Sequence, residues 1–461
     1  MRKEIYGLCS VITAISVFLS GCNSNNENTG RYFADVTEAP AVSESLLLTE
    51  DDTENIPENI KVVFSDYINS PTVSGIASKA EDNYYVKQLS EAEQYAFSEI
   101  VAGIIDYKEY ITLSKSITED QLVHIMNIAF TNVPEIFNAD IVYEYDVNES
   151  GYVRNFYPVY SMSFDIYQNV RDNLESQLLN QCKNKNVNEY NFLYDIYGRT
   201  LKLANLSPLS SVNNDQIKGY INASIAGTLN IGKMSPGLSS LGCAKYIKYY
   251  LDNMGIENLI CLGSLLPSGP DDQINSIYPQ LKFNTMFDPV KNVYRTTSDV
   301  CNYHAWNLVN IGGVWVNCDA WYDSYLSNSH YTPSYTMFCV PDEITRQTRL
   351  FYTNDNILGI TPPCSSYNYQ YLARNGYFIV NCADEAVQYY LEALIEDIAF
   401  NKVENATVQF ESEANYIAFI ALVDDEFKSY NSLHNNLIAS YTVSPCSQSL
   451  MLQIESIVYS N

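Results

Sequence analysis

Along residues 84–160, polar and apolar positions recur at helical spacing in two segments and alternate as in strands in two others. Both helical segments begin at residues that can cap a helix. Ser90 is followed three residues later by Glu93, which is the pattern of a capping box, and apolar residues from Tyr95 to Ile105 then recur at helical spacing. The stretch "SITEDQLVHIMNIAF" predicts a second helix by the same reasoning. The segments "ADIVYEYDV" and "VRNFYPVYSMSFDI" alternate apolar and polar residues, which predicts strands.

A similar pattern returns near the C-terminus. The segment "GYFIVNCADEAVQYYLEALIEDIAF" is followed by "ATVQFESEANYIAFIALV", and both regions read as strand, helix, strand, helix. The pairs Gln94-Tyr95 and Gln388-Tyr389 hold corresponding places. This favours a weak internal repeat, although any small α+β unit gives the same pattern. We expect both regions to form outer modules that flank a central domain.

The first 21 residues have the features of an export signal. Arg2 and Lys3 precede an apolar run that is too short to span a bilayer. The run ends in Leu19-Ser20-Gly21-Cys22, which resembles a bacterial lipobox and implies cleavage before Cys22 and a diacylglycerol group on its thiol. An ordinary secretory signal with a chance cysteine is the alternative. No later segment is apolar for long enough to be a transmembrane helix.

Charge and composition restrict the partners. Residues 22–60 are polar, acidic and poor in aromatics, so they predict a flexible tether. The chain carries 54 acidic and 26 basic residues, a net charge of −28, and such a surface repels the phosphates of nucleic acids. No phosphate-binding loop, metal-ligand cluster or dinucleotide fingerprint is present. The sequence therefore predicts no metal, no cofactor and no nucleic-acid partner.

The spacing of the cysteines predicts neither a disulfide framework nor a metal site. Of the 11 cysteines, Cys9 leaves with the signal and Cys22 takes the lipid, and no spacing among the others is that of a zinc site. Connectivity cannot be deduced from the spacing. We expect mostly free, buried thiols.

The stretch "YHAWNLVNIGGVWVNCDAWYDS", residues 303–324, predicts a β-hairpin that holds all three tryptophans. His304 to Asn310 and Gly313 to Ala320 are the expected strands. A symmetric loop of two or four residues that places Asn310 opposite Gly313 also places His304 directly opposite Asp319; Ile311 suits the four-residue loop better. An odd shift of this register would separate the two side chains onto different faces.

A carboxylate opposite His304 can accept the imidazole N–H, fix its tautomer and stabilise its charged form. Trp306, Leu308, Trp315 and Asn317 would share that face and line the site. A single histidine on an aromatic strand is more often structural, so the interpretation depends on the aspartate and on a nucleophile elsewhere.

These residues resemble the transglutaminase-like superfamily, whose core is a papain-like Cys-His-Asp fold. That family's histidine segment runs His-Ala-Trp-Asn, then a glycine-containing turn, a Trp, and an Asp fifteen residues after the His. The matching residues here are His304, Ala305, Trp306, Asn307, Gly313, Trp315 and Asp319. The resemblance covers roughly residues 190–325. The flanking modules resemble, more loosely, those of exported lipoproteins of Gram-positive bacteria.

Two residues compete for the nucleophile position in "GLSSLGCAKYIKYYLDNMGI", residues 237–256. The family's segment resembles Gly-x-Cys-x-Gly-Tyr-Ala-Lys, with Leu-Gly-Ile closing the helix. Without gaps, Ser240 takes the place of the cysteine, and we prefer this register. Cys243 takes that place only if the helix loses three residues. A helix N-terminus can pre-ionise a thiol, whereas a serine needs general-base help.

We therefore predict an α+β protein with a transglutaminase-like core. The expected parts are an export signal over 1–21, an acidic tether over 22–60, an N-terminal module over 61–175, a transglutaminase-like domain over 176–340 and a C-terminal module over 341–461.

The resemblance implies Cys/Ser-His-Asp acyl transfer on peptide or carboxamide groups of surface proteins or wall peptides, with hydrolysis favoured over cross-linking. A catalytically silent binding module that uses the same cleft is the alternative. In both cases the protein is expected at the outer face of the cytoplasmic membrane, held there by lipid at Cys22 alone.

Overall fold

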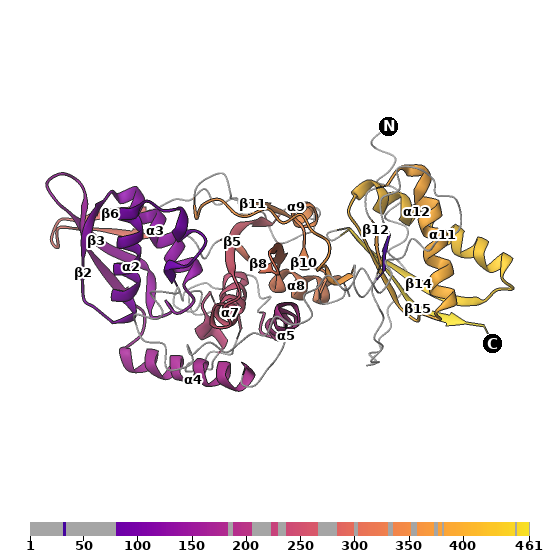
Figure 1. Ribbon diagram of the computed structural model, residues 1–461, viewed down its shortest axis with the longest axis horizontal. Coiled ribbons are helices and arrows are strands. Elements are labelled where there is room, and N and C mark those ends of the chain that lie inside the picture. The colour runs from indigo at the N-terminus through magenta and orange to yellow at the C-terminus, as the bar shows by residue number, and fades with distance from the viewer. Residues whose placement is uncertain are drawn as a thin grey trace.

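The structure is a computed structural model with three α+β parts arranged in a row along its longest axis (Figure 1). It describes residues 31–33, 80–182, 188–204, 223–228, 237–265, 284–298, 303–330, 335–351, 357–372, 377–379, 382–447 and 450–460. The predicted export signal and Cys22 lie outside these ranges. Within them, no helix is both long enough and apolar enough to cross a bilayer.

The N-terminal part begins as the sequence predicts. The short 3-10 helix η5 (Val86–Gln88) precedes α2 (Glu91–Ile105), and Ser90 forms the expected capping box with Glu93. A strand was predicted before this helix, and that prediction is wrong because the 3-10 helix η5 lies there. The remaining elements are β2 (Ile111–Ile117), α3 (Glu119–Asn132), β3 (Ala139–Val147) and β4 (Val153–Tyr160).

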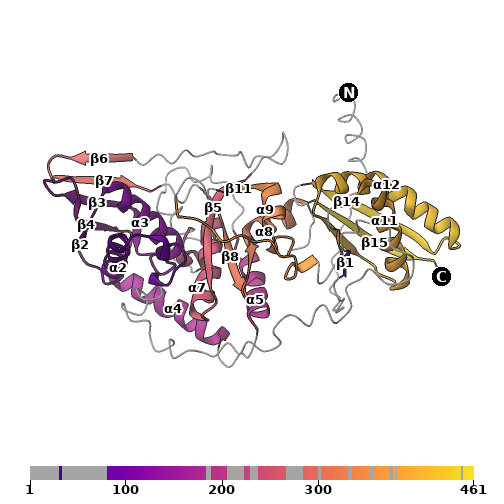
Figure 2. The same ribbon diagram turned by 45° about the horizontal axis from the view of Figure 1, so that its top comes forward.

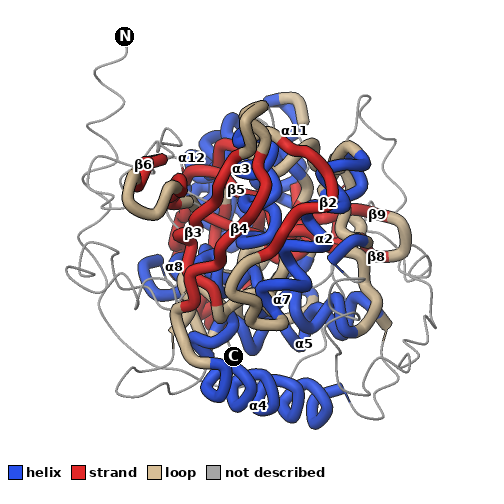
Figure 3. Tube along the Cα trace, turned by 90° about the vertical axis from the view of Figure 1, so that its left-hand side faces the viewer, coloured by secondary structure: helices blue, strands red, loops and turns tan. Residues whose placement is uncertain are grey.

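A hairpin from later in the chain completes the first sheet. Strands β6 (Asn284–Asp288) and β7 (Val293–Thr297) extend it to the order β2-β4-β3-β7-β6, with β7 antiparallel to β3. The hairpin lies beyond the edge of β3 in Figure 2, and β3 and β4 run side by side in Figure 3. A segment of the predicted transglutaminase-like range thus pairs with the N-terminal module.

The central part is built on an antiparallel sheet of order β10-β9-β8-β5-β11. Its strands are β5 (Asn258–Leu265), β8 (His304–Ile311), β9 (Val314–Cys318), β10 (Phe338–Val340) and β11 (Arg349–Phe351). The helices of this region are α4 (Phe164–Cys182), α5 (Glu189–Leu201), α7 (Ser240–Asn253), α8 (Ala320–His330) and α9 (Asp342–Thr348), with the 3-10 helix η7 (Ile225–Thr228). Strand β11 follows the predicted boundary at residue 340, so the central sheet reaches past it.

The C-terminal part carries the third sheet, β1-β12-β13-β15-β14. Its elements are β1 (Arg31–Phe33), β12 (Tyr377–Ile379), α11 (Asp384–Phe400), β13 (Ala406–Phe410), α12 (Glu413–Leu433), β14 (Ile438–Cys446) and β15 (Met451–Tyr459).

The two outer parts share one topology. Each runs helix, strand, helix, strand, strand, and in each the first strand and the hairpin's first strand both pair with the last one (β2 and β3 with β4, β13 and β14 with β15). They differ in where strands are added, because β7 joins β3 whereas β12 joins β13. The predicted order of strand, helix, strand, helix is thus confirmed in the C-terminal part (β12, α11, β13, α12) but wrong in the N-terminal part, and the topology that the two parts share begins at the first helix.

The central hairpin differs from its predicted register by two residues. Ile311 pairs with Val314, and Gly312 and Gly313 form a two-residue turn with φ of +57° and +89°. The predicted four-residue loop is wrong because two glycines supply the positive φ angles that the tighter turn needs. A shift of two keeps every side chain on its predicted face, because strand side chains alternate with a period of two.

Candidate functional site

The first element of the site is the tip of helix α7. Ser239 is the N-cap and its hydroxyl accepts a hydrogen bond from the backbone N–H of Gly242. Ser240 is thus the first residue of the helix, at the end where unpaired N–H groups and the helix dipole favour negative charge. Its half-buried hydroxyl accepts a hydrogen bond of 3.4 Å from the backbone N–H of Ala305.

This contact places the helix tip at the beginning of β8. Ala305 lies two residues before Asn307, the first residue of β8 that pairs with β9. The Asn307 side chain in turn donates a 2.9 Å hydrogen bond to the carbonyl of Ala244. The helix is therefore tied to β8 at two points, and Ser240 lies beside the residue that follows His304.

Cys243 lies one turn further into the helix and faces the core. Only 2% of the residue is exposed, and its Sγ lies 3.8 Å from the carbonyl of Leu238. Burial, reinforced by the charge of Asp319, raises the pKa of this thiol. The geometry thus puts Ser240 at the helix tip and gives Cys243 the environment of a structural thiol.

The hairpin brings His304 and Asp319 into direct contact. His304 Nε2 lies 2.5 Å from Asp319 Oδ2, and the two side chains are 6% and 3% exposed. Asp319 follows the last residue of β9 and lies diagonally across the hairpin from His304 instead of directly opposite. Because the carboxylate engages Nε2, Nδ1 is the ring nitrogen left for a reacting group.

Asp319 is held in its ionised form. Its Oδ1 accepts a 2.9 Å hydrogen bond from the backbone N–H of Tyr322 in the first turn of α8, and its Oδ2 accepts one of 2.9 Å from Arg349 Nε. Burial alone would raise its pKa, but the charges of His304 and Arg349 outweigh burial and lower the pKa to about 2. The carboxylate is therefore a fixed negative charge at neutral pH.

Arg349 is the residue of the site that sequence reasoning missed. It begins β11, is 1% exposed, and comes from the segment assigned by sequence to the C-terminal module. The pattern around it gives no signal, because its partner Asp319 is 30 positions away in the chain. Only the pairing of β11 with β5 brings the two together.

Aromatic rings surround the histidine. The Trp306 ring lies 5.9 Å from the imidazole in a stacked orientation, and Trp321 approaches it edge-on at 5.6 Å. Trp306 Nε1 donates a 2.9 Å hydrogen bond to Asn317 Oδ1, which fixes both residues. Of the three predicted lining residues, Trp306 thus lies next to His304, and Asn317 is bonded to Trp306.

The third predicted lining residue, Trp315, lies further along the same face. It pairs with Asn310 at the turn end of the hairpin, and its ring packs edge-on against Tyr84 of the N-terminal part, at 5.6 Å. The contact joins the outer part to the central sheet and leaves Trp315 away from the histidine.

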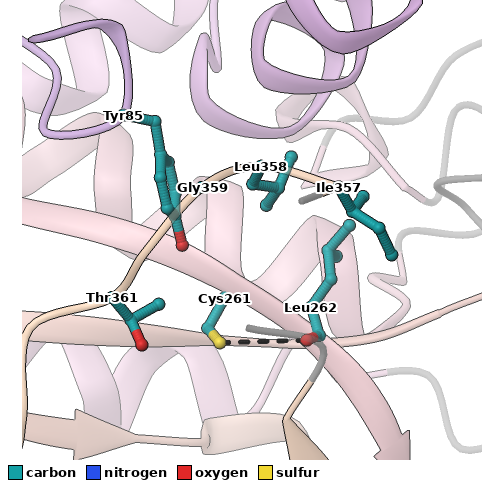
Figure 4. Close-up of a pocket in the computed structure, with 7 residues that line it drawn as sticks. All are labelled: Tyr85, Cys261, Leu262, Ile357, Leu358, Gly359 and Thr361. Carbon is teal, nitrogen blue, oxygen red and sulfur yellow. Dashed lines mark hydrogen bonds between the residues drawn. The ribbon is translucent and has the colours of Figure 1, made fainter. Parts of the chain in front are cut away.

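A small cavity lies on the Trp306 face of the central sheet. It is lined by Tyr85, by Cys261 and Leu262 of β5, and by Ile357, Leu358, Gly359 and Thr361 (Figure 4). Its volume is about 10 Å³, enough for about one water molecule. Cys261 pairs with Trp306 and Gly263 with His304, so the cavity lies nearer the start of β5 than the position opposite the histidine. Its volume is too small for a substrate.

In the part of the chain that the structure describes, no group of three or more His, Cys, Asp or Glu side chains could hold a metal ion. The arrangement is that of a hydroxyl at a helix tip next to the strand that carries an imidazole–carboxylate pair. No family model and no curated protein matches the chain.

Proposed function

We propose that this protein is a lipid-anchored, cell-surface hydrolase with a transglutaminase-like central domain, which cleaves peptide or carboxamide bonds through Ser240, His304 and Asp319. The observation that carries the proposal is the convergence of these residues from two distant segments. Ser240 opens α7 and contacts the backbone of Ala305, while the neighbouring His304 is paired with Asp319.

In the proposed reaction, Ser240 Oγ attacks the carbonyl carbon of the scissile amide while His304 Nδ1 accepts the hydroxyl proton. Asp319 holds Nε2–H and stabilises the imidazolium that forms. We propose the backbone N–H groups at the start of α7 as the donors to the oxyanion, which the helix dipole also stabilises. The imidazolium then gives its proton to the amine that leaves, and an acyl-serine remains.

In the second half, His304 removes a proton from a water molecule that attacks the acyl-serine. The acid is released and Ser240 recovers its proton. Transfer to water needs only solvent at the half-buried hydroxyl, whereas transfer to an amine needs a second, drier entrance. We therefore favour hydrolysis over cross-linking.

A fluorophosphonate probe, which modifies activated serines, tests this proposal on the full chain. We expect labelling of the wild-type protein and its loss in Ser240→Ala and His304→Gln. The matched control is Ser239→Ala, which removes the neighbouring hydroxyl and a helix cap but leaves Ser240 in place. Labelling that survives in Ser240→Ala would contradict the assignment.

The alternative is a binding module that retains the cleft without catalysis, and the observation in its favour is a serine at the place where the resembled family has cysteine. Ser240→Cys separates the two. A wild-type protein that resists the fluorophosphonate, together with a Ser240→Cys variant that reacts rapidly with iodoacetamide, would indicate an intact site without a working nucleophile. Failure of both proteins to react would show that the helix tip and the histidine do not cooperate at all.

A further inference from the structure

We propose that Cys318 and Cys339 form a disulfide bond when the exported chain folds, and that this bond fixes the segment that carries the carboxylate of the site. The proposal rests on the cell-surface location proposed above, because such bonds form and persist in oxidising compartments. It does not depend on whether the site is a hydrolase. It concerns two residues to which the proposed reaction gives no role.

The two sulfur atoms are close enough for a bond to form. Cys318 ends β9 and Cys339 is the middle residue of β10, and their Sγ atoms lie 3.9 Å apart. A disulfide bond is about 2.05 Å long, so the two atoms must approach each other by about 2 Å. Small rotations of the two side chains about their Cα–Cβ bonds can supply this movement.

The backbone of β10 turns the Cys339 side chain toward Cys318. In β10 the partners of Cys318 and Asn317 are Phe338 and Val340, so Cys339 between them is an extra residue in the ladder. In a regular strand its side chain would face away from that of Phe338. Its φ is +57°, which is uncommon for a residue with a side chain, and bulges of this kind re-aim side chains. Both cysteines consequently belong to one hydrophobic cluster with Phe338.

Hydrogen bonds already hold the neighbours of the two cysteines together. The backbone N–H of Asp319 donates a 3.1 Å hydrogen bond to the carbonyl of Met337. The backbone N–H of Met337 donates one of 2.9 Å to the carboxylate of Asp323, which also accepts a 2.5 Å hydrogen bond from the hydroxyl of Tyr197. Reactants that are held side by side in this way have a high effective concentration, which favours the bond between the thiols.

The bond would close residues 319–338 into a loop. This segment begins with Asp319 and includes Trp321, whose ring approaches the imidazole of His304 edge-on at 5.6 Å. Strand β10 has three residues, lies at the edge of the central sheet, and has an interrupted ladder at Cys339. A covalent link at this point supports a weakly paired strand and restrains both ends of the segment that carries Asp319.

The bond forms by two exchange steps with an external disulfide, such as that of a thiol oxidoreductase or of oxidised glutathione. The Cys318 thiolate attacks one sulfur of the oxidant and releases the other as a thiolate. The Cys339 thiolate then attacks the Cys318 sulfur of the mixed disulfide and displaces the second thiolate. The protein loses two electrons and two protons, and the oxidant becomes two thiols. Because both cysteines are fully buried in the folded protein, these steps belong to folding, before the core closes.

Mass spectrometry of the full chain, refolded with reduced and oxidised glutathione, tests the proposal. Remaining thiols are blocked with iodoacetamide in denaturant. Chymotrypsin then cleaves after aromatic residues such as Tyr322 and Tyr325, which separates the two cysteines. We expect the Cys318 and Cys339 peptides to be joined, two hydrogen atoms lighter than their sum and without the label. Reduction before blocking should separate them and allow both to be labelled.

The substitutions Cys318→Ala and Cys339→Ala should each abolish the cross-linked species. Cys261→Ala, which removes a similarly buried cysteine of β5, is the control and should retain it. Wild-type protein that is folded by circular dichroism but carries the label on both Cys318 and Cys339, or joins either one to another partner, would overturn the proposal. If the chain does not refold, protein secreted by an exporting host is analysed in the same way.

The bond should also stabilise the central part. Closing a loop of about 20 residues restricts the unfolded chain, so oxidised protein should melt about 5 °C higher than protein refolded with dithiothreitol. Cys318→Ala should show no such difference, and equal melting temperatures of the two wild-type forms would refute the stabilising role. A protein that reacts with fluorophosphonate but lacks the cross-link refutes only the disulfide, whereas a cross-linked protein that does not react refutes only the hydrolase.

Discussion

The most direct consequence of the site's electrostatics is the effect of Asp319→Asn on stability. The pKa of Asp319 is lowered from 3.8 to about 2 in the folded protein, so its ionised form contributes stability that is present above pH 3.8 and is lost as the pH falls through about 2. At 1.36 kcal/mol for each pH unit, this corresponds to about 2 kcal/mol at pH 7 and about 1 kcal/mol at pH 3.

The substitution also removes the charge that compensates the buried Arg349, and a buried charge without its partner costs about 3–5 kcal/mol. We therefore expect Asp319→Asn to lower the free energy of unfolding of the central part by about 2–5 kcal/mol at pH 7. The difference from the wild-type protein should shrink by about 1 kcal/mol at pH 3, because the carboxylate of the unfolded chain, with its ordinary pKa of 3.8, is by then mostly protonated.

Urea unfolding followed by tryptophan fluorescence measures this effect, because all 3 tryptophans lie within residues 303–324 and report on the hairpin. Asp323→Asn is the control. It lies one turn along α8 and is equally buried, but burial raises its pKa, so its contribution has the opposite dependence on pH. A loss below about 1 kcal/mol in Asp319→Asn at pH 7, or a loss that grows towards pH 3, would refute the reasoning.

Three further outcomes are expected. The buried thiol of Cys243, with its raised pKa, should react with iodoacetamide at neutral pH only as fast as the protein unfolds, and rapid labelling of the folded protein would favour Cys243 as the nucleophile. Trp306→Phe removes the indole donor to Asn317 and should lower the free energy of unfolding in urea by about 1–3 kcal/mol, whereas an unchanged value would show that the bond contributes nothing. Gly313→Ala forces a side chain onto a φ of +89°, so it should lower the free energy of unfolding by about 1 kcal/mol and the melting temperature with it. Gly312→Asn, at a φ of +57°, should lower the melting temperature less. Equal effects of the two substitutions would show that the turn relaxes.

The sequence predicts the part of the site that depends on the alternation of side chains along neighbouring strands and on the spacing of residues within one helix. The alternation along β8 and β9 places His304 and Asp319 on one face in any register shifted by an even number of residues, so their contact survived an incorrect turn assignment. The helix α7 was expected from the resemblance of residues 237–256 to the family's nucleophile segment, and the structure shows that Ser239 caps it.

Both the sequence and the three-dimensional structure were needed to identify the residue at the helix tip. Sequence alone left Ser240 and Cys243 as alternatives, since either can be aligned with a nucleophile position. The three-dimensional structure separates them, because one helical turn is the difference between a hydroxyl beside the start of β8 and a thiol in the core.

By itself, then, the sequence determined the capped helices α2 and α3, the strands β3, β4, β8 and β9, and the shared face of an imidazole and a carboxylate. These depend on side-chain spacing within a few residues. Only the tertiary structure decided that the β6–β7 hairpin joins the N-terminal sheet, that Trp315 packs on Tyr84 and that Arg349 shares the Asp319 carboxylate. Those contacts join segments far apart in the chain, and their formation depends on the packing of whole sheets, which no local pattern records.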